Sequence, residues 1–414
     1  MKAARSFRVG VNYWPAQQAL GFWRHWKRAE VSSDLAKMNN AGLDSVRLFL
    51  TWEDFQPRPD VIDTLVLDRL VQTLDAADDA GLAVIPTLFT GHMSGANLLP
   101  AWATSSKRAN GRFRVMSGGR LISATPLNWY THQPVRAAQV RLASACATSI
   151  AGHPALLAWD LGNENSNCTV PQSKESALSW LWKITDSIRE KDASTPITIG
   201  IHMEDLEEDR KLGPAEAATV CDFLTMHGYP GYASFTEGPT DERLLPFLAQ
   251  LTRFLGGGAD VLFSEFGVPT LPFPDREPAG FHQNLKQGPR LVSEEDAARY
   301  VRRGLRALQD CGASGAMVWC YSDYVPQLFN QPPFDRAPHE RTFGMYRADG
   351  SEKPVVAEVR AFCRPKPKVA VTPRVDESSF IDLTADDYYD APRRHLTRLF
   401  GSYCKVLGPD PYGG

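Results

Sequence analysis

The sequence lacks the features of membrane-spanning and secreted proteins. No run of apolar residues approaches the ~20 that a membrane-spanning helix needs. The opening MKAARSFRVGVNYW has two early basic residues but no apolar core of the kind found in signal peptides. We therefore expect a cytoplasmic protein without a membrane partner.

Cysteine is sparse and unpatterned. The seven cysteines are scattered and odd in number, and no two of them form a C-x-x-C spacing. Neither a disulfide framework nor a zinc site is indicated, and no cluster of His, Cys and carboxylate residues has the spacing of metal ligands. The sequence predicts free thiols, with no metal ion and no other cofactor.

A strong charge of either sign is also missing. The chain of 414 residues has 45 lysines and arginines against 48 aspartates and glutamates, for a formal net charge of -3. Such a balance does not favour a polyanionic partner, so nucleic-acid binding is not expected. With 43% hydrophobic and 22% charged residues, the composition is that of a globular protein with a large core.

What the sequence does contain is an alternation of short apolar runs and longer amphipathic stretches. The eight candidate strands are 7–13, 45–50, 82–89, 156–162, 196–201, 221–227, 260–266 and 314–320. The candidate helices between and after them are 30–41, 64–80, 134–151, 174–191, 241–255, 294–311 and 353–363. Almost wholly apolar strands are typical of parallel sheets covered on both faces. Eight strand–helix units predict an α/β fold, a (β/α)8 TIM barrel.

A doubly wound open sheet is the alternative to the barrel. That fold usually has a glycine-rich phosphate turn after its first strand, whereas the turn here reads NYWPAQQ. We expect residues 1–363 to form the catalytic barrel. Residues 364–414 are expected to form a Pro-rich connector and a short C-terminal segment, with Thr384 as a helix N-cap, packing on the barrel.

Functional side chains of such barrels gather at the carboxyl ends of the strands. Two glutamates lie at these positions, Glu164 after the fourth strand and Glu265 at the end of the seventh. Retaining glycosidases use two carboxyl groups ~5–5.5 Å apart, one as the nucleophile and the other as the proton donor. The remaining polar or aromatic residues near these strand ends are Arg47, His92, Asn163, His227, Tyr229 and Trp319, with Tyr321 and Asp323 beyond them.

The segments WDLGNEN (159–165) and VLFSEFG (261–267) resemble the acid/base and nucleophile strands of clan A glycoside hydrolases. Together with the six residues from Arg47 to Trp319, in their order along the chain, they resemble the active-site set of glycoside hydrolase family 5. This family includes cellulases, mannanases and β-mannosidases. The resemblance covers residues 7–325, and TWEDFQP (51–57) resembles a turn common after the second strand in this clan.

The resemblance implies a role for each of these residues. Glu265 is the expected nucleophile, kept ionised by Arg47 and the Tyr229 hydroxyl. Glu164 is the expected acid/base, and repulsion from an ionised Glu265 is expected to raise its pKa. The expected substrate-binding residues are Asn163 on the sugar 2-hydroxyl, His92 on other hydroxyls, Trp319 as the apolar floor, and His227 near Glu164.

Every one of these side chains also has an ordinary structural interpretation. A glutamate at a strand end is often salt-bridged, Arg47 could fill the barrel interior, and His92 or His227 could be satisfied structural histidines. Tyr229 and Trp319 could belong to the core. Tyr321 and Asp323 could equally have ordinary loop roles. Several aromatic residues near the same loop face could have packing roles: Trp14, Trp52, Trp102, Trp129 and Tyr232.

The function predicted from these observations is hydrolysis of β-linked oligosaccharides with net retention. An exo-acting β-mannosidase is favoured, because the opening GVNYWP resembles β-mannosidase-type members and because the long segment 90–133 could close one end of a cleft. An endo-β-mannanase or endo-β-glucanase is the alternative. A carbohydrate-binding barrel without catalytic activity is a further one. The sequence makes no prediction of oligomeric state.

Overall fold

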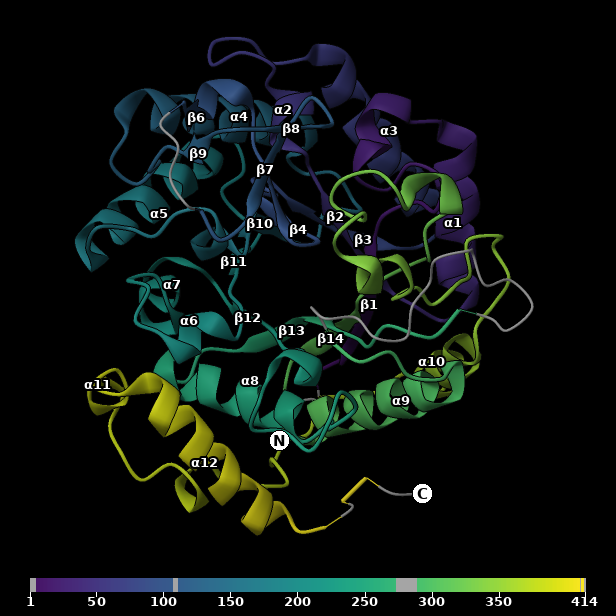
Figure 1. Ribbon diagram of the computed structural model, residues 1–414, viewed down its shortest axis with the longest axis vertical. Coiled ribbons are helices and arrows are strands. Elements are labelled where there is room, and N and C mark those ends of the chain that lie inside the picture. Colours follow the sequence, from purple (N-terminus) through teal and green to yellow (C-terminus); the bar gives the residue numbers. More distant parts are fainter. Residues whose placement is uncertain (1–4, 107–110, 273–288, 410, 413–414) are drawn as a thin grey trace.

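The computed structural model describes residues 5–106, 111–272, 289–409 and 411–412. Its main sheet has eight parallel strands in the order β11-β10-β3-β2-β1-β14-β13-β12, ringed by helices (Figure 1). In chain order these strands are β1 (Arg8–Tyr13), β2 (Ser45–Phe49), β3 (Ala83–Thr87), β10 (Trp159–Asn163), β11 (Ile197–Gly200), β12 (Leu224–His227), β13 (Val261–Phe266) and β14 (Gly315–Val318). Each lies within the strand range that the sequence predicts, or extends one residue past it.

The two edge strands of this sheet, β11 and β12, also meet. An isolated parallel bridge joins His202 to His227. The His227 N–H donates to the Ile201 carbonyl at 2.9 Å, and the Met203 N–H donates to the His227 carbonyl at 3.1 Å. The sheet therefore curls into a nearly closed barrel, which confirms the predicted (β/α)8 fold and excludes the open sheet.

Helices follow most of the strands and cover the outside of the barrel. The longer ones are α1 (Arg28–Asn40), α3 (Thr64–Asp79), α4 (Gln133–Ile150), α5 (Lys174–Arg189), α8 (Leu244–Leu255), α9 (Glu294–Asp310) and α10 (Pro354–Cys363). The short ones are α2 (Trp52–Phe55), α6 (Glu204–Glu207) and α7 (Pro214–Val220). Four of the longer helices, α3, α4, α5 and α9, start at side-chain caps: for example, the Asp63 carboxylate accepts the first free N–H groups of α3, and the Ser173 hydroxyl accepts one of α5. These caps fix where the helices begin.

The barrel interior changes character from one end to the other. Near the amino ends of the strands an apolar layer contains Ile85, Leu262 and Met317. Gly10 faces it, and a Cβ at Gly10 would lie 2.7 Å from the Met317 methyl group. Toward the carboxyl ends the buried side chains are polar, beginning with Asn12, Arg47, Thr87 and Asp160. The apolar layer thus supports a polar floor at the end where active sites of this fold lie.

A long insertion between β3 and α4 adds two small sheets above the barrel. One has the order β4-β5-β7-β8, and the other pairs β6 with β9. Their strands are β4 (His92–Met93), β5 (Ala96–Leu98), β6 (Thr104–Ser105), β7 (Arg114–Ser117), β8 (Arg120–Ile122) and β9 (Thr125–Pro126). This insertion carries His92 and the residues around Phe113 to the mouth of the barrel.

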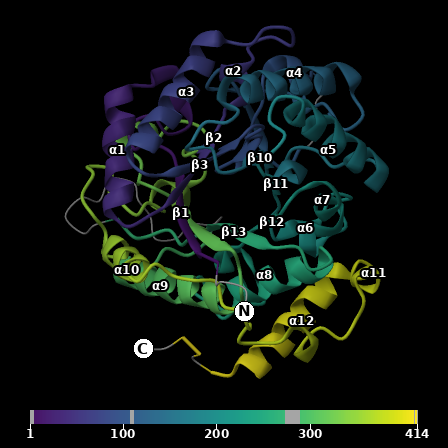
Figure 2. The same cartoon turned by 180° about the vertical axis from the view of Figure 1, so that it is seen from behind.

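The C-terminal helices α11 (Ala385–Tyr388) and α12 (Pro392–Leu407) lie along α6 and α8, as both views show in yellow (Figures 1 and 2). Thr384 caps α11 as predicted, because its hydroxyl accepts the Asp387 N–H at 3.2 Å. The Phe400 ring contacts Phe247 of α8 at 5.3 Å between centroids, and the Tyr388 hydroxyl donates to the Leu206 carbonyl at 2.7 Å. None of the helices in the described ranges has the length and apolar character that a membrane crossing requires.

Candidate active site

The carboxyl ends of the strands surround a cavity of about 720 Å³. Seven of the eight side chains selected from the sequence line it: His92, Asn163, Glu164, His227, Tyr229, Glu265 and Trp319. The eighth, Arg47, lies directly beneath, 1% exposed and in contact with Glu265. The structure thus brings the whole predicted set together.

Glu265 is held by groups that favour its ionised form. Its side chain, at the end of β13, is 5% exposed. The Arg47 guanidinium donates to Oε1, and the Tyr229 hydroxyl donates to Oε2 at 2.8 Å. Burial, followed by the Glu265 charge, raises the pKa of Tyr229 well above its usual value, so the phenol stays protonated as a donor.

Arg47 itself is fixed by a network beneath the cavity. Its Nε and Nη2 contact the Asp160 carboxylate at 2.8 and 2.7 Å, and Nη2 also donates to the Asn163 amide oxygen at 2.8 Å. Only glycine fits at position 200, because a Cβ there would lie 2.9 Å from Arg47 Nη2 and 2.6 Å from the Gly162 carbonyl oxygen. The guanidinium therefore has one orientation, with Nη1 aimed at the nucleophile position.

Glu164 follows β10 in a left-handed backbone conformation, with φ 48° and ψ 46°. Residues other than glycine rarely adopt this conformation, which is concentrated at functional sites. The turn directs the carboxylate across the barrel mouth, where Oε1 accepts from His227 Nδ1 at 2.9 Å and Oε2 accepts from Asn167 Nδ2 at 3.0 Å. The side chain is 15% exposed, more than that of Glu265.

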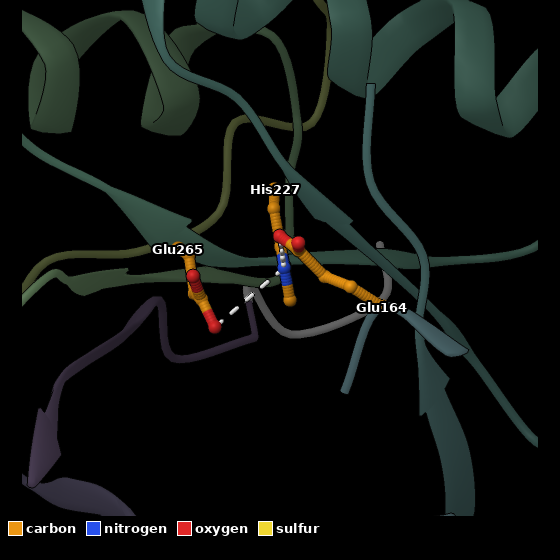
Figure 3. A group of neighbouring side chains, drawn as sticks. All are labelled: Glu164, His227 and Glu265. Carbon is orange, nitrogen blue, oxygen red and sulfur yellow. Dashed lines mark hydrogen bonds and ion pairs between the residues drawn. The ribbon is translucent and has the colours of Figure 1, made fainter. Parts of the chain in front are cut away.

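His227 lies between the two carboxylates (Figure 3). Its Nδ1 is 2.9 Å from Glu164 and 3.5 Å from Glu265, and one oxygen of each carboxylate lies within 4.8 Å of the other. Three such ligand atoms are also a minimal set for a metal ion. The Arg47 charge on Glu265 opposes a second cation there, so the donor set fits proton chemistry better than metal binding.

The charges around the pair set the pKa of each carboxyl in a direction that the sequence did not predict. Burial alone would raise the pKa of Glu164, but the charge of His202 and the hydrogen bond from His227 outweigh it and hold this pKa well below its ordinary value. For Glu265 burial is the largest cause and raises the pKa, against the charges of His227 and Arg47. The expectation that Glu265 raises the pKa of Glu164 was wrong, because it omitted the histidines.

The side chains of Asn163, His92 and Trp319 line the cavity and are held in place by neighbouring groups. Asn163 donates to the His92 carbonyl at 2.8 Å and accepts from Arg47, so its amide group is fixed. His92 Nδ1 lies 2.8 Å from the Asn97 amide oxygen and donates to it, which leaves Nε2 as an acceptor. Burial lowers the pKa of His92, so the ring stays neutral near pH 7. Trp319 is buried against Phe49 and lines the cavity.

Several residues of the site were missed in the sequence. Asp160 lies inside an apolar strand and gives no signal without Arg47 beside it. His202 directly follows β11, the same strand-end position that identified the others. Asn12, Asn167 and Glu340 also belong to the site or its support: Asn12 accepts from Arg47 at 3.3 Å, and Glu340 lines the cavity wall with Tyr232 and His339.

Some residues near the strand ends have other roles. The Tyr321 hydroxyl donates to Asp34 at 2.8 Å, and Asp323 pairs with Lys353 at 2.7 Å. Trp14, Trp52 and Trp129 are fully buried in the core, and Trp102 packs edge-on against Trp52. Of the rim aromatics named from the sequence, Tyr232 lines the cavity, with 48% of the residue exposed.

Comparison with known proteins agrees with this geometry. The β-galactosidase family model of glycoside hydrolase family 42 matches residues 22–194. A GH5_18 structure from Streptomyces cattleya in complex with GlcNAc superposes with a TM-score of 0.75 at 23% identity, covering 94% of this chain and 88% of that one. A variant from the same organism in complex with Manβ1-4GlcNAc gives 0.74 at 23% identity over 96% and 90%. No curated protein matches the chain.

A third structure, the exo-β-1,4-mannosidase of Opitutaceae bacterium strain TAV5, has 27% identity and a TM-score of 0.69, over 88% of this chain and 60% of that one. The chain is similar to clan A glycoside hydrolases, and its fold is similar to the folds of family 5 enzymes. The sequence match is to the family 42 model, whereas the similar folds include several of family 5.

Proposed function

We propose that this glycoside hydrolase is a retaining, exo-acting β-mannosidase, with Glu265 as the nucleophile and Glu164 as the acid/base. The observation that carries the proposal is the carboxylate pair itself, two glutamates from opposite sides of one barrel mouth with oxygens within 4.8 Å. A separation near 5 Å fits direct attack by one carboxylate, whereas inverting enzymes need ~6.5–9.5 Å to hold a water between the two.

In the first step a Glu265 oxygen attacks the anomeric carbon. The bond from that carbon to the leaving oxygen breaks, and the leaving oxygen takes the proton of Glu164. Arg47 and Tyr229 hold the attacking carboxylate in place, and the fixed Asn163 amide binds the sugar 2-hydroxyl, a contact that strengthens toward the transition state. In the second step Glu164 takes a proton from water, the water oxygen attacks the anomeric carbon, and Glu265 is released.

The walls of the cavity support exo action. The insertion between β3 and α4 contributes His92–Gly95 and Arg112–Arg114 to one side, and the loop after β14 contributes Arg336–Glu340 to another. The Ser94 hydroxyl donates to Glu340 across these two segments at 3.1 Å, which ties the walls together. A cavity bounded in this way admits one end of a chain and releases a single sugar per event.

Mannose is proposed as that sugar because similar structures include an exo-β-1,4-mannosidase and a GH5_18 variant holding Manβ1-4GlcNAc. We expect the axial 2-hydroxyl of mannose to be bound by Asn163 and His92, whose amide group and Nε2 line the cavity. The wrong epimer would leave a buried polar group unpaired, at a cost of about 1–3 kcal/mol. The family 42 match favours a second candidate, β-galactosidase activity.

A panel of aryl β-glycosides tests the proposal. We expect the β-mannoside to be hydrolysed faster than the β-glucoside and β-galactoside, with β-mannose as the first product by NMR. Short β-mannosides should fall to mannose, and mannan should lose little viscosity early. A preference for the galactoside would transfer the assignment to the second candidate, α-mannose as first product would exclude retention, and rapid viscosity loss would exclude exo action.

A further inference from the structure

His202 is a buried histidine with no part in the mechanism above. It lies just after β11 and is 6% exposed. Its Nδ1 is 3.8 Å from Glu164 Oε2, and its Nε2 is 3.0 Å from the Ser166 hydroxyl oxygen. The ring therefore connects the acid/base to a second polar group on the far side, and the position of its proton follows from that group.

The hydrogen bonds of Ser166 fix the tautomer of His202. The Ser166 hydroxyl donates its only proton to Asp205 Oδ1 at 2.6 Å. Arg210 Nη1 donates to the Ser166 oxygen at 3.1 Å. The remaining lone pair of that oxygen accepts a hydrogen bond, so His202 Nε2 must carry a proton and donate it.

With its proton on Nε2, a neutral His202 turns the bare lone pair of Nδ1 toward Glu164. Glu164 Oε1 already accepts from His227, and Oε2 accepts from Asn167 on one side. The free side of Oε2 thus faces a nitrogen lone pair, and two lone pairs facing each other repel. A single proton between Oε2 and Nδ1 removes this repulsion whichever of the two atoms holds it.

We propose that His202 shares the acid/base proton with Glu164, so that the proton donor of this enzyme is the Glu164–His202 pair rather than one carboxyl group. Before the sugar is cleaved, a movement that brings His202 Nδ1 and Glu164 Oε2 from 3.8 Å to hydrogen-bond distance lets the proton pass between them. It reaches the leaving oxygen from Glu164, and the second step returns it from water. His202 acts through Glu164 and touches no reacting atom, so it is a positioning residue.

Charged and titratable groups surround His202 on several sides. Glu164 faces the His202 ring from the loop after β10, and Asp205, Glu204 and Glu207 face it from α6. Arg210 faces it from the loop after α6, His92 from β4 and His227 from β12. Arg112 and Arg210 both pair with Glu204. Asp205 lies 3.7 Å from Nε2 and stabilises the charged ring.

Sharing predicts how the rate depends on pH. Two groups that share one proton hold it to a higher pH than the carboxyl group alone would, because both protonated forms count. The pH at which kcat/KM falls on the basic side then reports loss of a proton from the Glu164–His202 pair rather than from Glu164 alone.

The test compares His202→Gln with the wild-type enzyme on a substrate whose leaving group needs protonation. Glutamine can still donate to Ser166 but holds no second proton, so we expect the basic limb to move down by about one pH unit. The acidic limb and the rate with a very good leaving group should change little, which shows that the variant is folded. His153→Gln, on a partly buried histidine paired with Asp75 outside the cavity, is the matched control and should leave the profile unchanged.

Ser166→Ala provides a second variant that keeps the histidine. Without its acceptor the ring can move its proton to Nδ1 and donate to the ionised Glu164, so the basic limb should again fall. Unmoved basic limbs in both folded variants would overturn the sharing. The inference rests on the proposed function but fails separately from it: a wild-type enzyme without retaining β-glycosidase activity would refute that function, whereas an active wild type with unmoved variants refutes only the role of His202.

Discussion

The two carboxylates of Glu164 and Glu265, proposed as the catalytic pair, lie in one cavity but in opposite kinds of surroundings. Glu265 is held by Arg47, whose charge is permanent, and by Tyr229, whose burial keeps it protonated. Glu164 is surrounded by His227, His202 and His92, whose charges and hydrogen bonds lower its pKa. One side of the site thus has a permanently charged guanidinium, and the other side has imidazole groups.

This difference matches what each carboxylate has to do. A nucleophile must present the same ionised oxygen at every turnover, and a permanent neighbour in a rigid network ensures this. An acid/base must give up a proton and take one back in each cycle, so neighbours that titrate with it are useful. A permanent charge beside the acid/base would favour only one of its two protonation states, and therefore only one of the two steps of the reaction.

Removal of Glu265 should have the largest effect. Glu265→Ala eliminates the attacking oxygen, and we expect kcat to fall by at least about 10⁴-fold. Azide should restore part of the turnover and give an α-linked glycosyl azide, since the small anion attacks from the face that Glu265 occupied. NMR of the azide product checks this. Glu352→Ala, on an exposed ion pair with Arg360, serves as the control and should keep full activity.

Removal of Glu164 should depend on the substrate. Glu164→Ala is expected to slow substrates with poor leaving groups by about 10²–10⁴-fold, because they need the proton. Substrates with very good leaving groups should be cleaved at the first step nearly as before, and azide should yield a β-linked product. Equal losses with both kinds of leaving group would assign the proton to another residue.

Removal of the Arg47 charge should shift the acidic limb of the pH profile of kcat/KM. Arg47 is one of the groups that lower the pKa of Glu265 against its burial. Arg47→Met therefore raises that pKa, Glu265 becomes protonated at higher pH, and the acidic limb of kcat/KM moves up, with kcat reduced by about 10²–10³-fold. Arg47→Lys keeps the charge and should leave the limb near its wild-type position. An unmoved limb in a folded Arg47→Met would place the nucleophile elsewhere.

The smallest effect on activity is expected at Tyr229. Tyr229→Phe removes one hydrogen bond to a charged group, worth about 1.5–3 kcal/mol, and should slow kcat by about ten- to a hundred-fold. The acidic limb should rise less than in Arg47→Met, since a neutral donor is lost rather than a charge. The pH profiles of the two variants compare these shifts of the acidic limb. A larger shift for Tyr229→Phe than for Arg47→Met would contradict the proposal that the Arg47 charge keeps Glu265 ionised.

The barrel fold and the site residues at the strand ends could be predicted from the sequence. Eight apolar runs with helical stretches between them predict the barrel, and position at a strand end identified the side chains from Arg47 to Trp319. What such reasoning omits is lateral contact between neighbouring strands. His202 lies beside Glu164 because β10 and β11 are paired, with Asn163 opposite Gly200. Glu340 comes from an irregular loop without periodicity, so it could not be placed before the structure.

The left-handed backbone of Glu164 connects catalysis to the thermal stability of the chain. A side chain in this conformation costs about 1 kcal/mol, which glycine would not incur. Glu164→Gly should therefore melt at a higher temperature than Glu164→Ala, although both lack the acid/base; equal melting temperatures would show that the turn is unstrained. Selection for heat resistance alone would favour glycine at this position, and selection for turnover keeps glutamate. Position 164 is thus a point where a more durable protein and a working enzyme require different residues.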